Sequence, residues 1–326
     1  MRLPGLDGSN PLGFLAALGV LRVLDEAAKL RHTPAPLLGW EGASWAPVLH
    51  RVGSLEVIAT AVEHDARVWS DARRIRLAYP KLEKSGVKVF RGLKPSVAAL
   101  SAWLAECLDE GDREVLDCAA ALTAEPATEL IPEAKRPQVA DYFAVSCAFD
   151  PSAPLDLSTL PTAFDFTTRN TQFLDQVRLI GEIIDKDLLL AALTGDDSAG
   201  GRFAGRTMGW DPLAERPAAL YSYGRQPNPA LEWCAFRSLP FFPVFGKGGE
   251  LHTTGCSGRR KEGTFTWALW EPPIGTKVVR SLLSYPGLGD VTGGTRTAMG
   301  LSRVFRVRLA KAADGYTGVF SPTRTS

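Results

Sequence analysis

Cysteine and histidine are scarce in this chain of 326 residues, with five and four copies. The cysteines are odd in number, lie far apart and never form a C-x-x-C pair, which argues against a disulfide framework and a zinc knuckle. His252 and Cys256 stand four positions apart, but the stretch that holds them has the composition of a loop, and zinc needs three or four ligands. We therefore expect reduced, mostly buried cysteines, no bound metal and no other cofactor.

Long apolar runs are also lacking. An apolar stretch extends from Pro11 to Leu24, yet no stretch reaches the roughly 18 residues that a membrane span needs. Only Arg2 precedes this stretch, and charged residues follow it in place of a small-residue cleavage site, so it is typical of a structural helix and not of a signal peptide. With 45% hydrophobic residues, the sequence predicts a globular, cytoplasmic protein.

Complete catalytic motifs are missing too. The sequence has no G-x-x-x-x-G-K-[ST] loop, and its glycine-rich pieces at 246–249 and 293–296 lack that spacing. It has no G-x-S-x-G elbow and no cysteine with a plausible activating histidine. Glu182, Asp185 and Asp187 resemble fragments of a nuclease metal site only in composition, and a nuclease would lose metal-dependent cleavage when Asp165, Glu182 or Asp185 is changed. We expect a protein that is not an enzyme, with a divergent metal-dependent nuclease as a distant alternative.

Helical patterns dominate the first half of the chain. Asn10 and Pro11 indicate the start of a helix. The Asn10 side chain can accept a hydrogen bond from a backbone N–H of the first turn, and Pro11 lacks a backbone N–H at a position where that group would have no partner. This helix should run to about Lys29, and since it is apolar nearly all round, it should lie in the core. Further helices are expected at about 53–66, 96–110, 113–122, 171–193 and 228–238.

Strand patterns appear later, at 241–245, 265–270 and 302–309. In the last of these, Phe305, Val307 and Leu309 alternate with Val304, Arg306 and Arg308. One face is therefore apolar, and the other carries guanidinium groups. The order of elements predicts an α+β fold, with a helix-rich N-terminal lobe over 1–150 and a mixed C-terminal lobe over 151–326 that contains an antiparallel or mixed sheet. The prolines of 149–162 favour a boundary there, although the two lobes could form one compact unit.

Charge is distributed in blocks, although the net charge is only +1. Residues 67–94 hold nine basic and two acidic residues, a local charge of +7. Residues 106–150 have a local charge of −8, and residues 255–326 have +7. Such blocks indicate separate surfaces for a polyanion and for a basic protein neighbour, or else merely solvated faces.

Aromatic residues are interspersed among the cations of the basic segment 67–94. Cations neutralise phosphates and aromatic rings stack on bases, a combination that suits single strands and RNA. The alternative is that the aromatic rings are core anchors beside basic side chains that reach solvent. The candidate nucleic-acid-binding residues are Trp69, Arg73, Arg74, Arg76, Tyr79, Lys81, Lys88 and Arg91 in this segment, with Arg259, Arg260, Lys261, Arg306 and Arg308 towards the C-terminus.

Four strings, in order along the chain, resemble a family of proteins encoded with type I-G (formerly I-U) CRISPR systems. The strings are LDGSNPLGFLAALGVLRVLD (6–25), TAFDFTTRNTQFLDQVR (162–178), MGWDPLAERPAALYS (208–222), and SLPFFPVFGKGGELHTTGC continuing to FTWALWEPP (238–273). Members of that family look like large-subunit or helicase-associated components without a catalytic centre. The resemblance implies association with guide RNA, target DNA or other effector subunits.

The leading hypothesis is therefore a non-catalytic subunit of a type I-G antiviral effector complex that contacts guide RNA or target DNA through its basic surfaces. An alternative is a protein–protein adaptor that recruits the helicase-nuclease through the acidic region 106–150. Neither hypothesis involves a membrane. No base-reading residue is predicted, because base readout depends on geometry.

Overall fold

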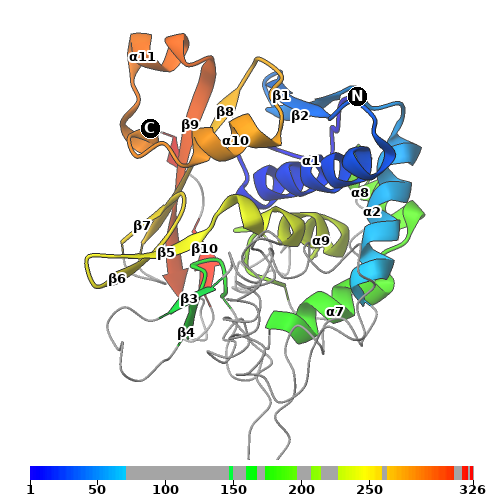
Figure 1. The fold of residues 1–326 in the computed structure, drawn as a ribbon, viewed down its shortest axis with the longest axis horizontal. Coiled ribbons are helices and arrows are strands. Elements are labelled where there is room, and N and C mark those ends of the chain that lie inside the picture. Colours follow the sequence, from blue (N-terminus) through cyan, green and yellow to red (C-terminus); the bar gives the residue numbers. More distant parts are fainter. Residues whose placement is uncertain are drawn as a thin grey trace, which may run out of the picture.

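The computed structural model describes residues 1–70, 147–149, 159–166, 173–196, 207–213, 227–258, 263–311, 318–321 and 324–325. The fold is α+β, as predicted, with helices and small antiparallel sheets (Figure 1). The described helices are α1 (Pro11–Arg31), α2 (Leu55–Ser70), α7 (Phe173–Ile183), α8 (Lys186–Thr194), α9 (Pro229–Ser238), α10 (Thr276–Leu283) and α11 (Gly293–Ala298), with 3-10 turns η5 (Leu239–Phe241) and η6 (Leu288–Asp290).

Helix α1 is the centre of the core. Asn10 accepts a hydrogen bond of 2.8 Å from the Leu12 backbone N–H, and Pro11 opens the helix, which confirms the predicted start. Its buried residues face all directions, and α9 is its main neighbour. The two backbones approach closely at Gly19, where an added Cβ would lie 1.6 Å from the Cys234 carbonyl oxygen. A small residue at this point therefore sets the distance between the two helices.

The other large helices pack around this pair. Helix α2 contacts α7 and α8, and α9 contacts both α7 and α8. The single helix predicted over 171–193 is wrong, because two helices occupy that range. Asp185 lies between them in extended backbone and accepts a hydrogen bond of 2.7 Å from Leu188 N–H. It thus caps α8 instead of continuing α7. The helix predicted at 228–238 is confirmed as α9, with Asn228 as its cap.

A sheet forms the other side of the molecule in Figure 1. Its strands follow the order β10-β9-β8-β7, with β11 also paired to β9, and the described pairs are antiparallel. The strands are β7 (Cys256–Ser257), β8 (Thr264–Trp270), β9 (Leu301–Lys311), β10 (Gly318–Phe320) and β11 (Arg324–Thr325). The predictions for 265–270 and 302–309 are thereby confirmed.

Aromatic side chains join the sheet to α1. Phe14 of α1 stacks on Trp40 and Trp267, with ring centroids 5.7 and 5.8 Å apart. The buried Trp267 indole donates a hydrogen bond of 2.9 Å to the Gly8 carbonyl, and the Trp270 indole donates one of 2.7 Å to the Leu38 carbonyl. The N–H groups of these two buried indoles are thus paired, as their burial requires. One continuous hydrophobic core contains residues from both ends of the chain.

Three two-stranded hairpins complete the described fold: β1 (Leu37–Glu41) with β2 (Ala46–His50), β3 (Cys147–Phe149) with β4 (Thr159–Pro161), and β5 (Val244–Lys247) with β6 (Glu250–Thr253). The strand predicted at 241–245 begins only at Val244, because η5 ends at Phe241. At the β5–β6 turn, Gly248 and Gly249 have φ of 61° and 79°, which glycine adopts at little cost. The glycine-rich piece 246–249 thus spans the tip of this hairpin.

The lobe boundary at 149–162 stays a prediction, since residues 71–146 lie outside the described residues. Within the described part of the chain, no helix combines the length and the apolar character needed to cross a membrane.

Candidate nucleic-acid interface

Strand β9 presents two arginines on the open face of the sheet. Phe305, Val307 and Leu309 are buried, whereas Arg306 and Arg308 are exposed. The alternation expected from the sequence is confirmed, because successive strand side chains point to opposite faces. Val304 is the exception to a fully polar outer face, since it too is buried.

Hydroxyl groups lie beside these arginines on the same face. In the β8–β9 register, Thr264 is opposite Arg308 and Thr266 is opposite Arg306. Ser257 of β7 pairs with Thr264, and their hydroxyl oxygens are 2.6 Å apart. We call these five residues the guanidinium–hydroxyl face. Hydroxyl and guanidinium groups are both donors to phosphate oxygens, so the face has the chemistry of a backbone-binding surface.

A turn of the chain fixes Arg306. Its Nη2 donates a hydrogen bond of 3.2 Å to the carbonyl of Gly289 in η6, and the exposed Asp290 carboxylate is 3.9 Å away. An ion pair this long and exposed contributes little. Among the described residues, no carboxylate forms an ion pair with Arg308. The two guanidinium groups therefore keep most of their capacity for an external anion.

The surrounding elements add positive charge. Residues 275–311 contain seven basic residues and a single acidic one, Asp290. Lys277 and Arg280 of α10 are exposed, and Arg296 of α11 and Arg303 of β9 are half-buried. An excess of one sign over neighbouring elements focuses the field toward an anionic ligand.

Most of the sequence-predicted site residues lie outside the described residues. These are Arg73, Arg74, Arg76, Tyr79, Lys81, Lys88 and Arg91 of the basic segment, and Arg259, Arg260 and Lys261 of the loop. Trp69 belongs to the last turn of α2, but its side chain is not described. Of the predicted set, the structure brings together Arg306 and Arg308.

Sequence reasoning missed the hydroxyl groups that share their face. Thr264 and Thr266 alternate with the buried Phe265 and Trp267, so the same period of two that identified the arginines would have found them. Ser257 could not be found this way, because its strand has only two residues.

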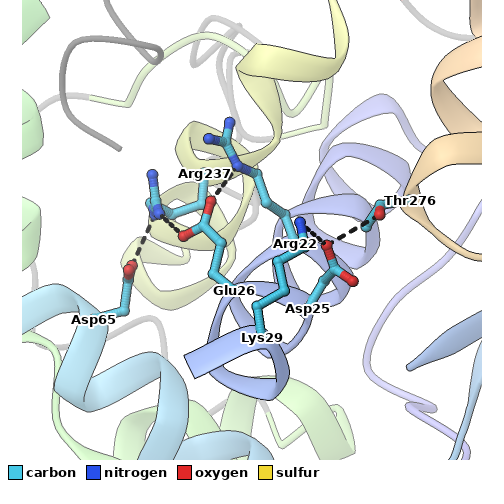
Figure 2. A network of polar contacts seen from close by, with 7 residues as sticks. All are labelled: Arg22, Asp25, Glu26, Lys29, Asp65, Arg237 and Thr276. Atoms are coloured by element: carbon cyan, nitrogen blue, oxygen red, sulfur yellow. Dashed lines mark hydrogen bonds and ion pairs between the residues drawn. The ribbon is translucent and has the colours of Figure 1, made fainter. Parts of the chain in front are cut away.

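A buried network of charges holds α2, the helix that leads into the basic segment 67–94 (Figure 2). The fully buried Arg237 of α9 donates to Asp65 of α2 over 2.9 Å and to Glu26 of α1 over 2.7 Å. The Trp233 indole adds a bond of 3.3 Å to Asp65, and Arg22 is 2.6 Å from Glu26. Three helices are thus joined by charge-assisted bonds.

The two carboxylates of this network differ in their titration. Burial raises the pKa of Asp65 above its ordinary value, although Arg237 and the Trp233 indole both oppose that effect. Burial acts on Glu26 in the same direction, but Arg237 and Arg22 together outweigh it and hold the pKa of Glu26 below its ordinary value. The second arginine explains the difference, because Arg237 is shared and Arg22 serves Glu26.

The carboxylates considered for a nuclease have other roles. Glu182 forms an ion pair with Arg178 one turn earlier in α7, and Asp185 caps α8. Asp165 is buried in the loop after β4. Within the described ranges, no group of three or more histidine, cysteine or carboxylate side chains is placed to hold a metal ion.

His252 and Cys256 line a small pocket together with Thr253, Ser257 and Leu309. The space open to the centre of a water molecule is ≈ 20 Å³, enough for about one water. Burial raises the pKa of the Cys256 thiol, and a protonated thiol is a poor metal ligand. As its described residues define it, the pocket has neither room for a nucleotide nor a set of metal ligands.

Comparison with known proteins adds no family to this description: no protein-family model matches the chain, and no curated protein does.

Proposed function

We propose that this protein binds a nucleic-acid backbone through the guanidinium–hydroxyl face, as a non-catalytic, cytoplasmic subunit of a type I-G CRISPR effector complex. The observation that carries the nucleic-acid part is the pair of exposed arginines Arg306 and Arg308 beside three hydroxyl side chains. These five side chains share one face of the sheet, and each carries a group that can donate to a phosphate oxygen.

Membership of a CRISPR effector rests on the four resembling strings. In this fold, the first string includes the capped start of the core helix α1, and the fourth extends from the end of α9 to β8. Guide RNA and target DNA are the polyanions that such a complex offers. The basic segment 67–94 would supply a second contact, and the α2 helix that leads into it is anchored by Asp65 and Arg237.

A salt series tests the nucleic-acid part. The full chain is titrated into fluorescent single-stranded RNA, single-stranded DNA and duplex DNA, and binding is followed by anisotropy at several salt concentrations. Each lost phosphate contact lowers the slope of log affinity against log salt by about 0.7 for a single strand. The double variant Arg306→Ala, Arg308→Ala should therefore bind more weakly and with a slope smaller by about 1.4.

The matched control is Arg31→Ala, Arg178→Ala, which removes two arginines from α1 and α7. It changes the net charge by the same amount, and we expect it to retain the slope of the wild type. Equal effects of the two double variants would show that only total charge matters and would refute a site on β9.

Complex membership needs a separate experiment. The tagged chain is co-expressed with the other type I-G subunits and a guide RNA, and purified with and without nuclease treatment. Recovery with the complex supports the proposal. Recovery of the helicase-nuclease alone, at high salt and after nuclease treatment, would instead identify the protein–protein adaptor.

A further inference from the structure

Tyr285 is a large exposed aromatic residue at the start of the turn that contacts Arg306 of the guanidinium–hydroxyl face. It follows α10, and 44% of its surface is exposed. Aromatic rings are normally packed against other side chains, because their large apolar area contributes most when it is buried. An exposed ring beside a cationic surface is the arrangement that single-strand-binding proteins use for stacking.

The turn 285–290 connects Tyr285 to Arg306. Leu288 N–H donates to the Tyr285 carbonyl over 3.2 Å, and Asp290 N–H donates to the Gly287 carbonyl over 3.0 Å. A Cβ added at Gly287 would lie 3.1 Å from the Tyr285 ring, and one added at Gly289 would lie 2.5 Å from Arg306 Nη2. The ring and the guanidinium thus rest on two glycines of one short turn.

Gly287 and Gly289 themselves place no side chain against the Tyr285 ring or the Arg306 guanidinium. The methyl group of Thr266 also lies against Gly289, at 3.5 Å from the same added Cβ. One turn therefore contacts Arg306 and Thr266 at Gly289 and carries the Tyr285 ring beside Gly287, two positions earlier.

The spacing of the arginines suits a single strand. Side chains two positions apart on a strand are about 6.7 Å apart, which is comparable to the separation of neighbouring phosphates in an extended single strand. Arg306 and Arg308 can therefore contact successive phosphates. A base attached next to the phosphate at Arg306 lies within reach of the turn that carries Tyr285.

We infer that the ligand of this face is a single-stranded nucleic acid, with the backbone along Arg306 and Arg308 and one base stacked on Tyr285. This inference rests on the proposed function and specifies it. Stacking on a ring is tolerant of sequence, because every base has a π-face. The site therefore takes DNA or RNA single strands with little preference among bases, and it binds them more tightly than the duplex, whose bases are already stacked.

The test separates ring from charge. Full-length Tyr285→Ala is titrated into a fluorescent single strand and into the same strand with abasic positions. We expect Tyr285→Ala to lower the affinity for the normal strand by about 5- to 150-fold with an unchanged salt slope, and to leave the abasic strand unaffected. Tyr285→Phe keeps the ring and should bind as the wild type does.

Val278→Ala is the matched control, because Val278 is an exposed apolar residue of α10, with 53% of its surface exposed. It should bind normally, and the melting temperature of each variant checks that the fold is intact. Normal binding by Tyr285→Ala, or equally tight binding of duplex and single strand by the wild type, would overturn the inference. If the wild type binds no nucleic acid at all, the proposed function fails first, and this inference fails with it.

Discussion

Arg237 Nε donates a hydrogen bond of 2.9 Å to Asp65 Oδ2, a contact between residues that stand 172 positions apart in the sequence. The other side of the same guanidinium reaches Glu26, 211 positions away. An arginine with no exposed surface is tolerated here because two carboxylates surround it. The core of this protein is therefore held by charge as well as by apolar packing.

Removal of this arginine should be costly. Arg237→Ala leaves Glu26 and Asp65 facing each other without the shared cation, and breaking a buried ion pair typically costs about 3–5 kcal/mol. Urea unfolding followed by circular dichroism measures the loss. Arg178→Ala is the control, because it breaks an ion pair whose side chains are 37% and 44% exposed and should cost at most about 1 kcal/mol. A loss for Arg237→Ala no larger than that of the control would contradict the role given to the network.

Glu26 should make stability depend on acid pH. Its pKa is lower in the folded protein than the ordinary value of 4.5, so the ionised form stabilises the fold. That contribution is complete above about pH 4.5 and is lost as the pH falls through the lowered pKa of the folded state. The difference in unfolding free energy between wild type and Glu26→Gln should therefore be largest near neutral pH and shrink in acid.

Asp65 supplies the opposite sign within the same network. Burial raises the pKa of Asp65 in the folded protein above the ordinary value of 3.8, so the protonated form stabilises the fold. That contribution is complete below about pH 3.8 and is lost as the pH rises through the raised pKa of the folded state. The stability of wild type relative to Asp65→Asn should accordingly decrease as the pH rises through that range. Parallel trends for the Glu26→Gln and Asp65→Asn series would show that the two carboxylates do not differ as described.

Local signals in the sequence predicted the elements whose causes are local. Asn10 and Asn228 each precede a proline and cap a helix, and the alternation around Phe305 gave the orientation of β9. The apolar period over 171–193 continues through Asp185, and this period predicted one helix where the structure has two. Cap chemistry decides here, because the Asp185 side chain accepts from Leu188 N–H, a first-turn donor of α8 that has no partner within its own helix.

Contacts between distant residues could not be predicted in this way. Nothing in the sequence near Arg237 distinguishes a fully buried arginine from one at an exposed helix end. Tyr285 was missed for the same reason, since its position depends on a turn that places Gly289 against Arg306. Both features depend on which elements become neighbours, and that information is spread over the whole chain.

Gly19 should resist even the smallest substitution. In Gly19→Ala the new methyl group would lie 1.6 Å from the Cys234 carbonyl oxygen, so α1 and α9 would have to move apart. Overpacking of this kind typically costs about 1–3 kcal/mol, which exceeds the gain of up to about 1 kcal/mol from replacing a helical glycine. We expect a net loss by urea unfolding.

Gly294→Ala is the matched control for Gly19→Ala. Gly294 also lies in a helix, α11, but nothing surrounds its added Cβ within 4 Å. This substitution should be neutral or stabilising by up to about 1 kcal/mol, because it reduces only the entropy of the unfolded chain. If both variants lose stability equally, the close approach of α1 and α9 is not what constrains Gly19.

Gly287→Ala tests the stacking site without removing the ring. The new methyl group would lie 3.1 Å from the Tyr285 ring, so the ring must shift by a few tenths of an ångström, and single-strand affinity should fall at an unchanged salt slope. Added to Tyr285→Ala, the same substitution should have no further effect, because the methyl group then meets no ring. A double-mutant cycle measured by anisotropy gives this coupling directly. Additive losses would mean that Gly287 acts on the backbone of the turn and not through Tyr285.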